Sequence, residues 1–172
     1  TPSPEMDNTT TPMGGTILKR AMVALLTDLK AIAKRLSGVT YFYQHSHRKQ
    51  RMQELLQSVG DLERLMAKVA TGRIGPRAIN QLKNSLLLIP KVTEITSQSD
   101  QEALRSLGEG LDSCFACCQW ITDQLSEDAP TQLGKGDTIA SGYSAELDDY
   151  RSIARDGKKI LDEMLERETE KT

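Results

Sequence analysis

Hydrophobic residues recur at helical spacing along nearly the whole chain. The clearest case is the segment 29–44, whose apolar residues lie three or four positions apart and predict one buried face of a helix: Leu29, Ile32, Leu36, Val39 and Tyr43. Similar spacing predicts further helices over these ranges: 13–25, 52–59, 61–71, 76–95 and 101–125. Pro90 falls inside one of them, so we expect a kink or break there.

The last thirty residues carry the most regular pattern. Apolar and small residues alternate three and four apart at Leu147, Tyr150, Ala154, Gly157, Leu161 and Met164, which is typical of a helix packed along a near-parallel partner. Ser144 is the expected N-cap. At 1.5 Å per residue this helix would be about 43 Å long. It has no closing Gly or Pro, and the chain starts at Thr1, so we expect a piece of a larger protein.

These patterns predict an all-α fold of six or seven helices. At most one short β-hairpin is expected, with 131–133 pairing with 137–139. We divide the chain into an extended lead (1–11), a helical core domain (12–141) and the start of a long helix (142–172). Helix caps are expected at three positions: Thr11, Asp28 and Asp100.

Three cysteines are clustered at Cys114, Cys117 and Cys118. They fall on the predicted helix 101–125, whose expected buried face is formed by Leu104, Leu107, Leu111, Cys114, Phe115, Cys118 and Ile121. A single CxxC pair on a helix is weak evidence for zinc, and cysteine is often buried, so core packing is the favoured interpretation. Three thiols also make no disulfide framework, which favours reduced thiols and a cytoplasmic protein.

The small net charge of −2 hides two oppositely charged halves. Residues 12–91 hold 14 Lys and Arg against 4 Asp and Glu, whereas residues 92–172 hold 8 against 18. The halves would complement one another inside the fold, or the basic half would face a polyanion such as DNA. The basic stretch His45–Arg51, next to Tyr41–Tyr43, leaves the same choice between a nucleic-acid contact and a solvated helix junction, and we favour the junction.

Catalytic motifs are not found in the sequence. It contains no phosphate-binding GxxxxGK[ST] loop, GxGxxG, HExxH or GxSxG. Asp148 and Asp149 are adjacent, so they point in different directions on a helix and cannot act as a carboxylate pair. No apolar run is long enough to cross a membrane. We therefore predict no catalytic, cofactor-binding or metal-binding residue and no cofactor on this chain.

Several short motifs occur along the chain: Thr11-Pro12-Met13-Gly14-Gly15, Asp28 with Arg35-Leu36, Asp61-Leu62-Glu63-Arg64, Gly72-Arg73 with Pro76-Arg77, and Gly142-Tyr143 with Glu146-Leu147-Asp148. In this order they resemble motifs of the MutS family of DNA mismatch repair proteins. Together they cover nearly the whole chain. Thr16, Ala21 and Leu25 depart from the family's usual Arg, Trp and Pro, which affects the expected packing of the first helix.

The resemblance implies the central core domain and the start of a lever helix leading towards a clamp domain. Such a segment would be non-catalytic and would couple binding of mismatched double-stranded DNA to an ATPase domain elsewhere. ATP, Mg²⁺ and homodimer formation would belong to the full-length protein, and the segment alone would bind DNA weakly or not at all. Two alternatives stay open: a free-standing helical protein–protein adaptor, and a small helical enzyme that uses zinc through its cysteines.

Overall fold

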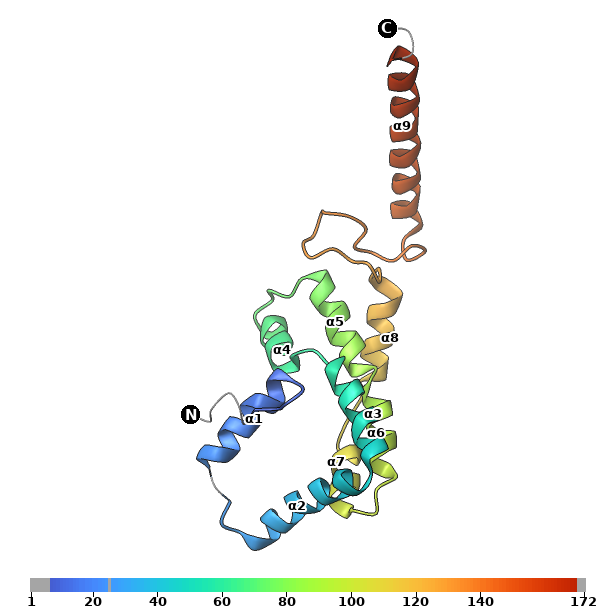
Figure 1. The fold of residues 1–172 in the computed structure, drawn as a ribbon. Helices are drawn as coiled ribbons and strands as arrows, with labels where there is room; N and C mark the ends of the chain where they lie inside the picture. The colour runs from blue at the N-terminus through green and yellow to red at the C-terminus, as the bar shows by residue number, and fades with distance from the viewer. Residues whose placement is uncertain (1–6, 25, 170–172) are drawn as a thin grey trace.

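The computed structural model describes residues 7–24 and 26–169, with side chains up to residue 159 (Figure 1). This part of the chain forms nine α-helices and one isolated β-bridge. The helices are α1 (Pro12–Val23), α2 (Leu29–Gln44), α3 (Ser46–Gln57), α4 (Leu62–Ala70), α5 (Pro76–Leu86), α6 (Ile89–Ser97), α7 (Glu102–Glu109), α8 (Phe115–Gln124) and α9 (Ala145–Thr169). The predicted all-helical class is confirmed.

Helix starts follow local capping chemistry. The Thr11 hydroxyl accepts a 3.0 Å hydrogen bond from the Gly14 amide, and the Asp28 carboxylate accepts one of 3.0 Å from Lys30, so both predicted caps are confirmed. The predicted cap at Asp100 is wrong. Helix α7 begins after Gln101 without a side-chain cap, and the nearby Ser99 hydroxyl accepts from the Gln101 amide instead.

Two predicted helices are each divided in two. The break near Pro90 is confirmed: α5 ends at Leu86, and α6 restarts with Pro90 in its first turn, where a missing amide proton does no harm. The continuous helix over 101–125 is wrong, because α7 ends at Glu109, with Gly110 as its C-cap, and α8 starts only after Cys114. Cys114 has φ +48°, a left-handed conformation that cannot continue a right-handed helix.

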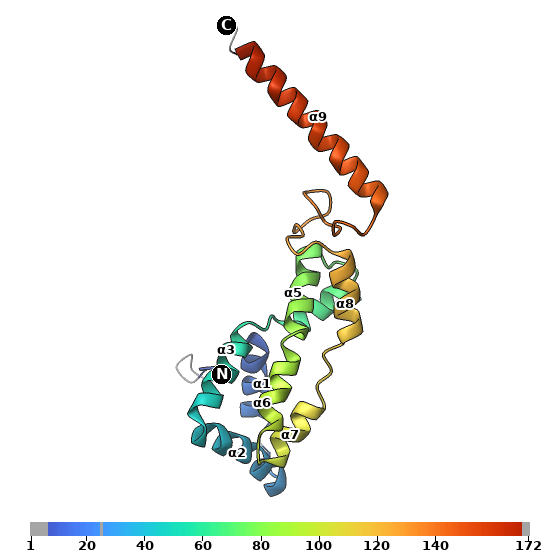
Figure 2. The same cartoon turned by 90° about the vertical axis from the view of Figure 1, so that its right-hand side faces the viewer.

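Helices α5, α6, α7 and α8 form an elongated row, and α4 and α1 lie to one side of it (Figures 1 and 2). Helices α5 and α6 follow one another, with α8 packed against α5 and α7 against α6. Helix α4 packs on α5, α3 packs on α6, and α2 contacts both α3 and α7. Helix α9 extends from the end of the row formed by α5 and α8, opposite α2 (Figure 1). At 1.5 Å per residue its 25 residues span about 37 Å.

The buried core is small and lies between these helix pairs. Its apolar members are Tyr41, Leu65, Leu82, Ile95, Leu104, Cys118, Ile121 and Ala129. Helices α6 and α7 approach each other closely at Gly108, where a Cβ atom would clash with the Thr96 hydroxyl oxygen. Glycine at this position therefore allows the two helices to pack against each other.

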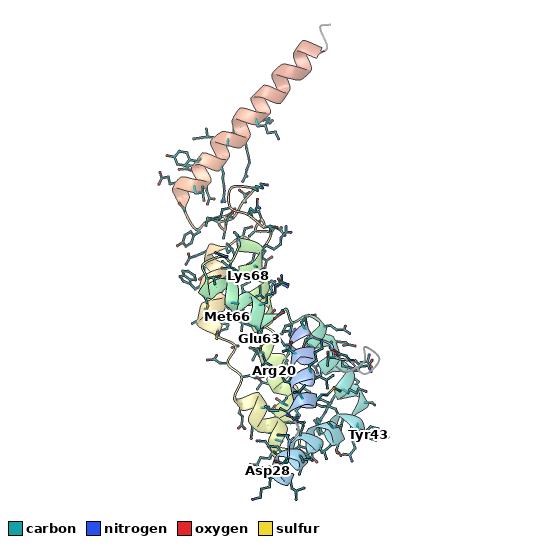
Figure 3. The ribbon with its side chains drawn as sticks, turned by 90° about the vertical axis from the view of Figure 1, so that its left-hand side faces the viewer. Arg20, Asp28, Tyr43, Glu63, Met66 and Lys68 are labelled. Carbon is teal, nitrogen blue, oxygen red and sulfur yellow. The ribbon has the colours of Figure 1, made fainter. Side chains whose placement is uncertain are left out.

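The predicted buried face of α2 is wrong in the described structure. Leu29 is 80% exposed and Tyr43 is 87% exposed (Figure 3), whereas Tyr41 is buried. Helix α2 packs instead through Gly38, where a Cβ atom would lie 3.4 Å from Leu104 of α7. Of the three aromatics at 41–43 only Tyr41 is fully buried.

The predicted inward faces of α1 and α4 are only partly covered. On α4, Leu65 is buried, but Met66 and Val69 are exposed (Figure 3). On α1, Ile17 is exposed, and Leu25 lies outside the described residues. No helix in the described part of the chain combines the length and apolar character needed to cross a membrane.

Candidate functional site: the junction at the base of the terminal helix

The loop between α8 and α9, residues 125–144, closes back on its own start. Leu125 forms an antiparallel bridge with Ile139. The Ser126 amide donates to the Thr138 carbonyl at 3.0 Å, on one side of this bridge. The predicted hairpin between 131–133 and 137–139 is not formed, because Ile139 pairs with the end of α8 instead. We call this loop, with the residues of α5 and α9 that hold it, the junction.

Helix α5 holds the junction from one side. Asn80, 6% exposed, donates through Nδ2 to the carbonyls of Ser126 at 2.7 Å and Glu127 at 3.1 Å. The Arg77 amide, in the first turn of α5, donates to the Pro130 carbonyl at 3.2 Å. The helix start thus uses a free amide of its first turn to bind the loop.

A close backbone contact completes this side of the junction. A Cβ atom on Gly75 would lie 2.5 Å from the Thr131 carbonyl oxygen. The clash would involve a backbone atom, which cannot rotate away as a side chain would. Glycine is therefore required for the loop to approach the N-cap of α5 this closely.

Helix α9 is attached to the junction through Arg151, whose side chain is 14% exposed. Its Nη2 donates to the Ile139 carbonyl at 3.0 Å. Its Nε lies 3.0 Å from Asp137, and its Nη1 lies 3.2 Å from Asp148. The planar guanidinium binds these three partners at the same time, which a lysine ammonium on a flexible stem would do less well.

The first turn of α9 is fixed by a second set of bonds. The Ser144 hydroxyl accepts from the Leu147 amide at 3.3 Å, which confirms the predicted cap. The Asp148 carboxylate accepts from the Gly142 amide at 2.7 Å, where Gly142 takes φ +85°. Asp148 is half-buried and Asp149 is exposed, so the two carboxylates do point apart.

Sequence reasoning did not identify Arg151, Asn80 or Asp137 as partners. A local signal existed for Arg151, which lies three positions after Asp148 on the same helix face. A buried Asn inside a helix also indicates a side chain with a specific partner. The partners of Asn80 lie 46 and 47 positions further along the chain, however, and no local pattern reveals them.

The basic stretch at 45–51 serves mainly to join helices. His45 is the single residue between α2 and α3, and its Nδ1 lies 2.8 Å from the Tyr41 carbonyl. Arg48 donates to the Tyr41 hydroxyl and, at 3.0 Å, to the Gln98 carbonyl. Arg51 lies 3.7 Å from Glu94 of α6. These contacts favour the interpretation of residues 45–51 as a connection between helices, rather than as a nucleic-acid contact.

Two open apolar hollows lie along α2. One, about 510 Å³, is bounded by α7 and lined by Gly38, Phe42 and Leu104. The other, about 400 Å³, is bounded by α3. Val39 and Phe42 line both hollows.

The cysteines fall into two environments. Cys118 is 1% exposed, and this burial, with the neighbouring thiols of Cys117 and Cys114, raises its pKa above the usual value. Cys114 and Cys117 are exposed, so the predicted core position of Cys114 is wrong. The cause is the break before α8, which changes the phase of the helical pattern. Among the described residues no group of three or more His, Cys, Asp or Glu could hold a metal ion.

Comparison with known proteins decides the family. The MutS domain III family matches residues 5–171, nearly the whole chain. The chain belongs to the MutS domain III family. The resemblance carried by the short sequence motifs is thereby confirmed, and the departures at Thr16, Ala21 and Leu25 do not prevent the match.

Curated relatives agree with the family match, and each is named DNA mismatch repair protein MutS. The proteins of Christiangramia forsetii, Flavobacterium psychrophilum and Bacteroides fragilis are 44%, 41% and 39% identical to this chain over 167 residues. These alignments cover 97% of this chain but 19% of each relative. The chain is thus similar to the core domain of a mismatch repair protein and spans about a fifth of the length of its relatives.

Proposed function

We propose that this chain is the non-catalytic core and lever segment of a longer mismatch-recognition ATPase. It couples the binding of mismatched double-stranded DNA in one part of that protein to nucleotide turnover in another. The family match and the relatives' names support the mismatch repair role. They do not favour a free-standing adaptor or a small zinc enzyme.

The junction is the observation that carries this proposal. Arg151 ties the base of α9 to Ile139, and the backbone of Ile139 pairs with Leu125 at the end of α8. Beyond this attachment the described side chains of α9, residues 152–159, are exposed. A long helix that is held at its base, and whose described side chains beyond that point are exposed, can act as a lever, since a small tilt at the base becomes a large displacement at the tip.

Further parts of the proposal concern the longer protein. ATP and Mg²⁺ bind outside this chain, the active form is a cytoplasmic homodimer, and residues 142–172 lead from the core (12–141) towards a clamp domain. The isolated chain binds DNA weakly or not at all, because its acidic half opposes phosphate contacts. A mismatch preference retained by the isolated chain at physiological salt would contradict this.

The coupling role is tested in the longer protein with Arg151→Met, compared with Arg155→Met one turn further along α9. Arg151→Met keeps a long side chain but removes every bond that Arg151 itself makes to the junction. We expect basal ATP turnover and mismatch affinity to stay within about twofold of wild type. The stimulation of ATP turnover by mismatched DNA should fall about tenfold, which is a typical size for allosteric coupling. Arg155→Met should leave stimulation intact, since Arg155 is exposed.

Two outcomes would contradict the proposal. Unchanged stimulation in Arg151→Met would show that the junction does not transmit the signal. Loss of basal turnover in the same variant would show instead that Arg151 supports the nucleotide site itself.

A further inference from the structure

Cys114 and Cys117 form an exposed CxxC pair at the start of α8. Neither thiol is used by the core or by the junction. Cys114 is the N-cap of the helix, and the Cys118 amide donates to the Cys114 carbonyl at 3.0 Å, which closes the first helical turn. The two exposed cysteines are therefore three positions apart at the start of α8, with Cys114 at the N-cap and Cys117 in the first turn.

The spacing suits a disulfide bond. Positions three apart within a regular helix have Cβ atoms about 5–6 Å apart, whereas a disulfide needs about 3.5–4.5 Å. Cys114 is left-handed and lies just before the helix, so its Cβ atom does not follow this helical spacing and must move to reach disulfide distance. Cys114 can make this movement, because it precedes the helix proper and its side chain is exposed.

The backbone at Cys114 is a second, independent feature. Among the described residues, Cys114 is the one non-glycine residue with positive φ, at +48°. Its amide donates to the Asp112 carboxylate at 2.8 Å, and this bond helps to hold the turn. A left-handed non-glycine residue is strained, and such strain recurs at sites with a chemical role.

Cys118 is excluded as a partner by its position. It is buried between α8 and α5, and its thiol lies 3.9 Å from the Lys83 carbonyl of α5. A disulfide to Cys118 would require this thiol to leave the core. The exposed pair can react without disturbing the packing of α5 against α8.

We propose that Cys114 and Cys117 are a redox pair that is reversibly oxidised to a disulfide by glutathione disulfide. The thiolate of one cysteine attacks glutathione disulfide, forms a mixed disulfide and releases one glutathione. The second thiolate attacks the protein sulfur of that mixed disulfide, forms the S–S bond and releases the second glutathione. Two electrons pass to glutathione disulfide, and the two protons end on the released glutathione thiols.

The bond would restrain the link between α7 and α8. This link, residues 110–114, is the non-helical segment that joins α7 to α8. Oxidation fixes Cys114 against the first turn of α8. Reduction leaves Cys114 free to change its backbone conformation.

The test equilibrates the 172-residue chain with glutathione buffers of increasing oxidised-to-reduced ratio, followed by acid quenching, alkylation and peptide mass mapping. We expect the main product to have lost two hydrogens, with Cys114 joined to Cys117. It should exceed singly glutathionylated chain by about tenfold or more, because the second thiol attacks at a high effective concentration. Reduced glutathione in excess should restore both thiols.

Matched variants separate this pair from the other possibilities. Cys118→Ala should still form the Cys114–Cys117 bond, whereas Cys117→Ser should stop at a glutathione adduct on Cys114. Circular dichroism of each variant establishes that it remains helical. Stable glutathione adducts on both exposed cysteines of the wild-type chain, or a bond to Cys118, would overturn the proposal.

Discussion

Arg151 of α9 donates a 3.0 Å hydrogen bond to the backbone carbonyl of Ile139, the residue that pairs with Leu125 at the end of α8. One residue of the loop therefore contacts both helices. Any tilt of α9 that preserves this bond must move Ile139, and with it the end of α8. The lever and the helical row are joined at this point.

Replacing Arg151 should loosen the base of α9. In Arg151→Met the Ile139 carbonyl loses a charged donor, which should reduce local stability by about 1–2 kcal/mol. The ion pair with Asp137 adds little, since that carboxylate is 66% exposed. Hydrogen exchange should accelerate at the amides of Ala140 and Gly142. Equal acceleration in the exposed control Arg155→Met would show that the junction bond is not the cause.

Asn80 should be the most sensitive position on the α5 side of the junction. Asn80→Ala leaves the carbonyls of Ser126 and Glu127 without their donor in a buried place, and should lower the free energy of unfolding by about 1–3 kcal/mol. Asn80→Asp should lower it further, because a carboxylate would face two carbonyl oxygens. Urea unfolding measures both changes.

Asn84 provides a matched control for Asn80. It lies one turn further along α5 and is exposed, so Asn84→Ala should change the unfolding free energy by less than about 0.5 kcal/mol. If Asn80→Ala behaves like Asn84→Ala, the two bonds to the loop contribute nothing measurable.

Local chemistry allowed much of this fold to be predicted from the sequence. The caps at Thr11 and Asp28 and the break near Pro90 depend on residues within four positions of one another. The start of α9 at Ser144 is of the same kind. Such features need no knowledge of the rest of the molecule, which is why they were found.

The predictions were wrong where contacts between segments distant in the sequence determine which side chains are buried. Periodicity correctly placed α2 on the chain, but it could not reveal that Gly38 and Tyr41 would pack while Leu29 and Tyr43 stay exposed. The junction was missed for the same reason. Its bonds join α5 to residues 46 and 47 positions away, and a helical pattern contains no information about them.

Gly108 should be intolerant of even one added methyl group. In Gly108→Ala the new Cβ would clash with the buried Thr96 hydroxyl oxygen, so either the Thr96 side chain must rotate and lose its hydrogen bonds, or α6 and α7 must move apart. Overpacking of this kind should lower the free energy of unfolding by about 1–3 kcal/mol. Gly110→Ala, whose Cβ would meet nothing closer than 3.5 Å, is the control and should be near neutral. Thermal unfolding compares the two, and a larger loss at Gly110 would contradict the proposed close packing.

The burial of Cys118 should make stability depend on alkaline pH. Burial raises the pKa of this thiol above its ordinary value of 9.0, so the folded chain keeps the proton when the unfolded chain has lost it. The stability contributed by the neutral thiol is complete below pH 9.0 and is lost as the pH rises from there through the folded pKa. We expect the wild-type unfolding free energy to fall more steeply above pH 9 than that of Cys118→Ala, in which no thiol titrates at this position. Cys117→Ala removes the smaller contribution of a neighbouring thiol and keeps the burial of Cys118, so its slope should lie between those of wild type and Cys118→Ala. Urea unfolding at a series of pH values measures the difference, and parallel curves for wild type and Cys118→Ala would show that burial does not hold this proton.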